Sequence, residues 1–313
     1  MTNLKIQNIL VGVDGERADV VKQAATVAKA MNSRLKLVDA IADPPAYRKM
    51  AISNYEELAN MARSAKRELL RKLEQRLRAQ SLDAETAVLA GEMDAAIVAE
   101  AAREGHDLIV VATDEGGGLG GAGVRLLRKA PCSVMFVQPG RSRKRMRIAA
   151  AVDTEPMNEE HAELNVAILN LADSLAAAMG AELHILHAWR APGESMFTHS
   201  AFSKMKEAQL EQYVEETRRQ HAGELLKLLA ACRTTLPARC IHLEKGDARV
   251  VIPGFCKKNK IDLLVMGTVG RAGLSAFVLG NTAEAVANEI DCSLLAVKLP
   301  PSGAASDELG VAS

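Results

Sequence analysis

The chain has 313 residues, 48% hydrophobic and 25% charged, and its 39 Lys and Arg residues balance 39 Asp and Glu residues. This composition predicts a globular protein of about two domains, at roughly 150 residues each, and excludes collagen-like, disordered and disulfide-dense classes. Because the net charge is zero, no overall field attracts nucleic acid or a membrane, and an anionic partner must be held by local geometry.

The first half of the chain alternates short apolar runs with helical patterns. Ile9–Asp14 is an apolar run that ends in an aspartate and precedes an Ala-rich amphipathic segment, and Leu35–Val38 is the next predicted strand. A long helical stretch covers Tyr55–Gln80, and Asp107–Val111 and Pro131–Met135 are two further buried strands. Strands that alternate with helices in this way predict βαβ units and a parallel sheet.

The second half repeats these elements in the same order. Ile148–Asp153 is again an apolar strand ending in aspartate, Leu183–Leu186 is the next strand, and Ser203–Cys232 is the long helical stretch. Three later features recur at one offset of 155 positions. The matched pairs are Gly91 and Gly246, Ile97 and Ile252, and Asp107–Val111 and Asp262–Met266. The last strands, Pro131–Met135 and Asp291–Leu295, recur at an offset of 160, so each half reads as five strands connected by helices.

A short polar segment, Pro139–Arg147, joins the two copies, and Pro300–Ser313 is small and polar, which predicts a disordered tail. We expect an α/β architecture with two tandem doubly wound five-stranded parallel sheets flanked by helices. The predicted boundaries are a first domain over residues 1–140, a basic linker over 141–147, a second domain over 148–300 and a tail over 301–313.

In doubly wound sheets, ligands bind at the carboxyl ends of strands where the strand order reverses, which directs attention to the loops after the first and fourth strands. In the second half, the latter loop begins Gly267-Thr-Val-Gly270, continues for nine residues and ends in Gly280-Asn-Thr282 at the start of a helix. Glycines let backbone N–H groups approach phosphate, and a helix N-terminus adds unpaired N–H groups and a positive dipole end. The spacing indicates an anion site, although a Gly-rich turn with Asn281 and Thr282 as N-caps needs no ligand.

This motif, together with an aspartate after the first strand, resembles the universal stress protein family. The two-copy chain, with its runs Gly267–Ser275 and Leu279–Glu284, is similar to the tandem E-type members, and the resemblance covers nearly the whole chain. It implies a strand order of 3-2-1-4-5 in each sheet and pairing of the two last strands, so that the chain forms an internal pseudo-dimer. It also implies binding of ATP or AMP, which occurs in some members.

The resemblance implies roles for individual residues of the second half. Asp153 would reach the ribose or a magnesium ion, and the adenine would sit at the end of the second strand near His187 and Ala188. Many nucleotide-binding members have Ser or Thr directly after the third glycine, where this chain has Asn281, with Thr282 one residue later. A shift of one residue turns a helical side chain by about 100°, but an Asn amide can also donate to phosphate. The implied phosphate cradle consists of Gly267, Gly270, Gly280, Asn281 and Thr282.

The first half departs further from the family pattern. From Ala112 to Cys132 there are 20 positions, against 25 from Gly267 to Cys292, so five residues are missing where phosphates would lie. Ala112 replaces the first glycine, and the remaining run, Asp114–Gly123, opens with two carboxylates that would repel phosphate. We predict that this half binds no ATP and that the run is a loosely ordered surface loop.

Other polar residues favour structural roles. His184 and His187 lie three apart on a strand, so they point to opposite faces and cannot share a metal without a bend. His242, on the third strand, could approach one of them, which leaves a zinc site conceivable but unsupported. The basic run Arg141–Arg147 is interpreted as a solvated linker, with nucleic acid or anionic lipid as the alternative partner.

Cellular location is predicted from what the sequence lacks. No uninterrupted apolar run approaches the ~18 residues of a membrane-spanning helix, and residues 1–6 lack the pattern of an export signal. We therefore expect a soluble, cytoplasmic protein without a membrane partner. The five cysteines are widely spaced and include no Cys-x-x-Cys pair, which predicts reduced and mostly buried thiols.

No hydrolase or phosphate-loop motif is present: the sequence has no Gly-x-Ser-x-Gly, His-Glu-x-x-His or Gly-x-x-x-x-Gly-Lys-Ser/Thr. The predicted function is that of a universal stress protein whose second domain binds ATP and which acts as a nucleotide-responsive regulator or scaffold in a stress response. Enzymatic activity beyond weak ATP hydrolysis is not expected. The alternatives are a slow Mg-dependent ATPase that uses Asp153, or a module that binds a different small ligand through the first domain or the domain interface. Protein partners and assembly into a homodimer stay open.

Overall fold

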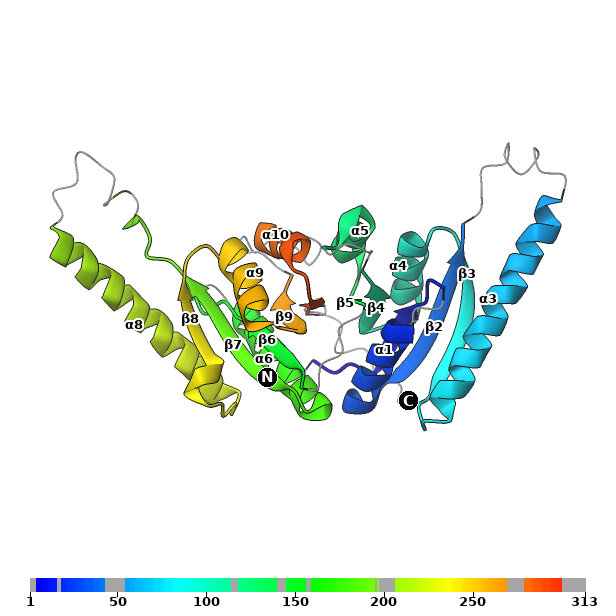
Figure 1. The fold of residues 1–313 in the computed structure, drawn as a ribbon, viewed down its shortest axis with the longest axis horizontal. Helices are drawn as coiled ribbons and strands as arrows, with labels where there is room; N and C mark the ends of the chain where they lie inside the picture. The colour runs from blue at the N-terminus through cyan, green and yellow to red at the C-terminus, as the bar shows by residue number, and fades with distance from the viewer. Residues whose placement is uncertain are drawn as a thin grey trace, which may run out of the picture.

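The computed structural model describes residues 4–15, 18–42, 54–113, 118–139, 145–155, 159–194, 196, 206–268 and 279–299. Each half of the chain alternates five strands with helices (Figure 1). The first half consists of β1 (Asn8–Gly12), α1 (Ala18–Met31), β2 (Arg34–Ile41), α3 (Tyr55–Arg78), β3 (Ala84–Ala90), α4 (Met93–Glu104), β4 (Leu108–Ala112), α5 (Gly120–Lys129) and β5 (Ser133–Val137). The second half consists of β6 (Arg147–Ala151), α6 (Glu159–Met179), β7 (Glu182–Trp189), α8 (Glu207–Ala231), the 3₁₀ turn η1 (Ala238–Cys240), β8 (Ile241–Lys245), α9 (Ala248–Asn259), β9 (Leu263–Gly267), α10 (Asn281–Glu289) and β10 (Ser293–Val297).

The ten strands form one continuous sheet in the order β3-β2-β1-β4-β5-β10-β9-β6-β7-β8. Within each half the neighbouring strands are parallel and follow the order 3-2-1-4-5, which confirms the predicted topology. At the centre β5 and β10 pair antiparallel, with Met135 opposite Leu295. The predicted internal pseudo-dimer is therefore confirmed, and the two last strands leave no open sheet edge at the seam.

Helices cover both faces of the sheet, which explains why its strands are near-continuous apolar runs. Leu108, Ile109 and Val110, for example, are completely buried in β4. One core layer lies between the sheet and helices α1, α3, α6 and α8. The other lies between the sheet and helices α4, α5, α9 and α10. At the seam α1 packs against α6, so the two halves share one of these layers.

Helix α6 is an unusually apolar helix of this fold. Its window His161–Met179 is long and apolar enough by composition to cross a membrane, and no other helix in the described part of the chain passes that test. Half of this window is buried inside the fold, where Leu169, Ala172 and Leu175 are fully inaccessible. Polar residues interrupt it, so it escapes a search for uninterrupted apolar runs. Core helices of soluble proteins share this composition.

The segment between the halves differs slightly from the sequence prediction. Arg147 was expected in the linker but is the first residue of β6. Its backbone N–H donates to Asp262 Oδ2 at 2.8 Å and its guanidinium donates to the carbonyl of Asn259 at 2.9 Å. The rest of the basic run up to residue 144 and the predicted tail, 301–313, lie outside the described residues.

The glycine-rich run of the first half was expected to be a loose surface loop, and for its second part this is wrong. Asp114 and the three residues after it lie outside the described residues, but Gly120–Gly123 form the first turn of α5. Gly118 has a φ of +69°, and a Cβ there would lie 2.8 Å from the backbone oxygen of Asn288 in α10. The run therefore packs the first half against the second through a close approach that glycine permits.

We expect Gly118→Ala to lower the free energy of unfolding by about 2 kcal/mol, because alanine adds left-handed backbone strain and a clash with the Asn288 carbonyl. Gly105→Ala is the matched control, since Gly105 has a φ of +67° but a Cβ there would have nothing within 4 Å. It should cost about 1 kcal/mol, from strain alone. Denaturant unfolding measures both variants, and equal losses would contradict the packing role of Gly118.

Candidate functional site

A cavity of about 270 Å³ opens at the carboxyl ends of β6, β7 and β9. β6 pairs with β7 on one side and with β9 on the other, so this is where the strand order of the second half reverses. Doubly wound sheets bind ligands at such a switch point. The floor of the cavity is apolar and includes Ala151, Leu186 and Met266 from the strands, Ile168 from α6 and Ile252 from α9.

Residues that the sequence assigned to a site come together in this cavity from four separate segments. Of the seven residues that the sequence assigned to this site, Gly270 lies outside the described residues. A Cβ at Gly267, which ends β9, would lie 2.7 Å from Leu164 Cδ2. Packing against α6 therefore also constrains this position. The six residues that line the cavity are Asp153 after β6, Ala188 in β7, Gly267 at the end of β9, and Gly280, Asn281 and Thr282 at the start of α10.

The N-terminus of α10 is capped differently from the sequence prediction. Gly280 is the N-cap and makes no side-chain hydrogen bond to the helix, so Asn281 and Thr282 are the first two helical residues and not caps. Both are exposed and both line the cavity, so the one-residue shift from the family pattern leaves polar side chains at the site. N–H groups of a first helical turn have no intrahelical acceptor, and the helix dipole is positive there. This end of the cavity suits an anion.

The N-terminus of α9 also borders the cavity, but a carboxylate caps it. Asp247 Oδ1 accepts the Arg249 N–H at 3.0 Å, and the guanidinium groups of Arg249 and Arg190 lie 2.7 and 3.1 Å from Asp247 Oδ2. Hydrogen bonds from Arg249 are the main reason that the pKa of Asp247 lies far below its usual range. These three residues were not predicted, although a Gly-Asp pair before an apolar helical pattern is an N-cap signal.

Hydrogen bonds on two sides fix the backbone that carries Asp153. Asn165, buried on α6, accepts the Asp153 N–H at Oδ1 (3.1 Å) and donates from Nδ2 to the Asp153 carbonyl (2.6 Å). On the other side the Val152 N–H donates to the Leu186 carbonyl at 3.0 Å, and His187 Nδ1 lies 3.0 Å from the Val152 oxygen. We call residues 152–155 the Asp153 arm. Asn165, one of two asparagines within the apolar helix α6, was the only sequence signal for this clamp.

Two histidine pairs lie on opposite faces of β7, as strand geometry predicted. His184 Nδ1 is 3.1 Å from His242 Nε2, which confirms that the third strand brings His242 close. On the other face His187 Nε2 is 2.9 Å from His221 Nδ1 of α8. The His187 side chain therefore points away from the cavity, whereas Ala188, the next residue of β7, lines it. Within the described ranges no group of three or more His, Cys, Asp or Glu could hold a metal, and the zinc hypothesis finds no third ligand there.

Two buried histidines and the half-buried His242 predict loss of stability in acid. Burial is the largest cause that lowers the pKa values of His184, His187 and His242, whereas an unfolded histidine titrates near 6.5. Below about pH 6.5 the unfolded state therefore binds more protons, so the free energy of unfolding falls as the pH drops toward the folded-state pKa values. Denaturant unfolding at pH 7.5 and 5.5 should show this loss. His184→Phe/His242→Leu should reduce it, and an unchanged pH dependence in that variant would contradict the assignment.

The model of the universal stress protein family matches residues 5–138 and again residues 144–298. The chain belongs to the universal stress protein family. It is 31% identical over 175 residues to a universal stress protein E homolog of Haemophilus influenzae, covering 56% of this chain and 54% of that relative. Universal stress protein E of Escherichia coli K12 is 28% identical over 211 residues, which cover 65% of this chain and 64% of that relative. The matches thus span about half to two thirds of these relatives.

Solved structures share the tandem universal stress protein fold over nearly the whole chain. A functionally unknown protein from Pseudomonas aeruginosa PAO1 has a TM-score of 0.69 at 25% identity, with 94% of this chain and 92% of that chain covered. A universal stress protein from Archaeoglobus fulgidus DSM 4304 has a TM-score of 0.62 at 15% identity, with 93% and 98% covered. The second likeness is one of fold alone.

Proposed function

We propose that the second half of this universal stress protein binds ATP or AMP in the cavity at the ends of β6, β7 and β9, and that the first half, residues 1–140, serves as a scaffold without such a site. The observation that carries the proposal is the meeting of six assigned residues from four segments around one cavity of about 270 Å³. Residues up to 129 positions apart, from Asp153 to Thr282, contribute to it.

Phosphates are assigned to the α10 end of the cavity. The N-terminus of α9 is already capped by Asp247, whereas within the described residues no side chain caps that of α10. The N–H groups of the first turn of α10 and the side chains of Asn281 and Thr282 are therefore the donors that a phosphate would use. An anion at this end also gains from the positive end of the helix dipole.

The other parts of a nucleotide fit the remaining walls. Asp153 would accept hydrogen bonds from ribose hydroxyls, and the apolar floor of the cavity suits a base. Asp153 and Glu155 both line the cavity, and carboxylate oxygens are ligands that Mg²⁺ accepts. These two residues would hold a magnesium ion, which would offset phosphate charge.

The proposed role is regulatory, because α10 contacts both the ligand cavity and the first half. Glu284, in the first turn of α10, accepts two hydrogen bonds from Arg128 of α5, at 2.7 and 2.6 Å. The C-terminal end of α10 receives the Gly118 N–H at the carbonyl of Ile290. A ligand that favours one arrangement of the α10 N-terminus therefore biases the contacts across the seam. Partners that touch α5 and α10 would sense occupancy.

Calorimetric titration of nucleotide-stripped protein with Mg-ATP tests the proposal, with AMP as the second ligand and inorganic phosphate as the control. We expect one site per chain for ATP and weaker binding of phosphate alone, which lacks the base and ribose contacts. A stoichiometry of two would show that the first half also binds. Absence of binding by both nucleotides would contradict the proposal.

A further inference from the structure

A buried histidine ties the sheet to the Asp153 arm from behind the cavity. His187 is fully inaccessible to solvent, its Nδ1 lies 3.0 Å from the carbonyl oxygen of Val152, and its Nε2 lies 2.9 Å from Nδ1 of His221. A carbonyl oxygen only accepts, so the proton of the neutral His187 ring is on Nδ1 and Nε2 is an acceptor. His221 must then donate from its own Nδ1. The contacts thus define one tautomer for each ring.

The first half has a different pair at the corresponding positions. Asp39 in β2 stands where His187 stands in β7, and Lys66 in α3 stands where His221 stands in α8. Lys66 Nζ lies 2.5 Å from Asp39 Oδ1, so this pair also ties the sheet to the long outer helix. A carboxylate cannot donate to a carbonyl oxygen, however. The side chain at this position can therefore donate to the carbonyl that follows the first strand only in the second half, which has the cavity.

We propose that His187, held by His221, is a positioning residue for Asp153. It fixes the carbonyl of Val152 and thereby sets the direction in which the Asp153 carboxylate enters the cavity. Asn165 clamps the Asp153 peptide from α6, and His187 holds the preceding peptide from β7, so the arm is fixed on two sides. Its effect on a ligand rests on the proposed nucleotide function, whereas its effect on the arm does not.

Two amide variants separate the two bonds of His187. In His187→Asn the side-chain amide N–H takes the place of Nδ1 and still donates to the Val152 carbonyl. In His187→Gln the side-chain amide reaches the position of Nε2 and forms a hydrogen bond with His221 instead of with the Val152 carbonyl. Both variants place a similar polar group in the same buried space, so a difference between them reports the bond to the arm. Asp39→Asn is the matched control at the corresponding position of the first half.

The readouts are amide hydrogen exchange of Val152 and Asp153 by NMR without ligand, and Mg-ATP affinity by calorimetry. We expect His187→Asn and Asp39→Asn to stay within threefold of wild type in both. His187→Gln should raise the amide exchange of Val152 and Asp153 and weaken Mg-ATP binding, each at least tenfold. A tenfold change corresponds to about 1.4 kcal/mol, which is the size of one lost hydrogen bond. Equal behaviour of the Asn and Gln variants would overturn the inference.

A second variant keeps the test decisive if substitutions at His187 fail to fold. His221→Ala, at a half-buried position of α8, leaves the His187 ring without its partner and should raise exchange of the Asp153 arm beyond the threefold range allowed for the control variants. Unchanged exchange in this variant would overturn the role of the pair. If wild type bound no nucleotide while exchange still distinguished the Asn and Gln variants, the positioning role would stand and the proposed nucleotide function would fail.

Discussion

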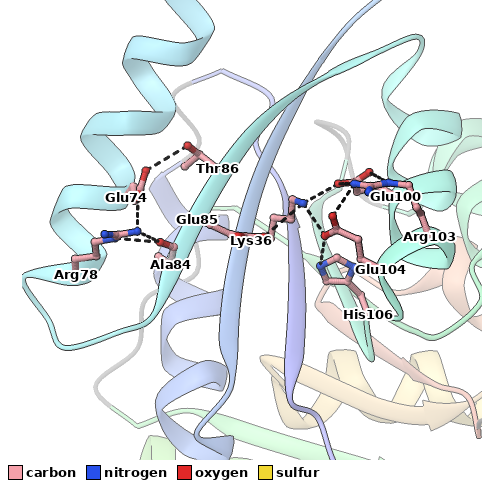
Figure 2. A network of polar contacts seen from close by, with 10 residues as sticks. All are labelled: Lys36, Glu74, Arg78, Ala84, Glu85, Thr86, Glu100, Arg103, Glu104 and His106. Carbon is pink, nitrogen blue, oxygen red and sulfur yellow. Dashed lines mark hydrogen bonds and ion pairs between the residues drawn. The ribbon is translucent and has the colours of Figure 1, made fainter.

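Lys36→Met is expected to lower the free energy of unfolding by about 3 kcal/mol, because it leaves a buried carboxylate without one of its partners. Lys36 Nζ in β2 lies 2.8 Å from Glu100 Oε1 and 2.6 Å from Glu104 Oε2 of α4 (Figure 2). The side chain of Lys36 is 11% exposed and that of Glu100 is 7% exposed. Arg103 also pairs with Glu100 at 2.7 Å, which limits the loss. Denaturant unfolding at neutral pH measures it.

The charges of this network persist through the neutral range. Burial acts to lower the pKa of Lys36, but hydrogen bonds to Glu100 and Glu104 outweigh it, and the pKa is raised. Burial acts to raise the pKa of Glu100, and the hydrogen bonds from Arg103 and Lys36 reverse that effect. The substitution therefore removes a full charge from a buried ionic group.

The second half supplies the control for this prediction. His184 and Phe255 stand at the positions that correspond to Lys36 and Glu100, so the fold accepts uncharged side chains there. The double variant Lys36→Met/Glu100→Leu should recover most of the stability, since no buried charge is left unpaired. A double variant no more stable than Lys36→Met, or a single loss below about 0.5 kcal/mol, would contradict the role of the network.

Asn281→Asp should weaken Mg-ATP binding at least tenfold while leaving the fold slightly more stable. The substitution keeps the size of the side chain and adds a negative charge at the first residue of α10, where the phosphates are proposed to bind. Like charges a few ångströms apart repel by about 1 to 4 kcal/mol, depending on how much water separates them. At a helix N-terminus the same charge favours the dipole by about 0.5 kcal/mol. Calorimetry and denaturant unfolding measure the two opposite effects.

Gly121→Asp provides the matched control for Asn281→Asp. Gly121 is the corresponding residue of α5 in the first half, and a Cβ there would meet nothing closer than the end of Arg125 at 3.6 Å. It should leave ATP affinity within twofold of wild type. Asn281 is preferred to Gly267 for this test, because a side chain at Gly267 would also clash with Leu164. Unchanged affinity in Asn281→Asp, or equal losses in both variants, would contradict the phosphate assignment.

The sequence predicts the fold well because its signals are local and repeated. Apolar strands such as Asp107–Val111 and Asp262–Met266 recur at one offset, and their alternation with helices restricts the chain to parallel βαβ units. The position of the site after β6 and β9 was also predictable, because the carboxyl ends of parallel strands meet at one edge of a sheet. Strand order and the pairing of β5 with β10 came from family resemblance and not from periodicity.

The contacts that hold the site were not predictable, because each depends on the register between distant elements. Asn165 reaches the Asp153 peptide only through the rotation of α6, and His187 reaches Val152 only through its place in β7. The cap of α10 falls on Gly280 and not on the better capping residue Asn281, so capping propensity alone does not predict where this helix starts. Gly118 was interpreted as flexible because its contact, Asn288, lies in the other half.

Hydrogen exchange of the full chain with and without saturating Mg-ATP tests the central claim most directly, namely that two halves of one fold carry one nucleotide site. We predict protection of residues 151–155, 186–188 and 279–284, with the corresponding first-half residues 12–14, 38–40 and 119–124 unchanged. Protection of the first-half residues, or no protection anywhere, would contradict it.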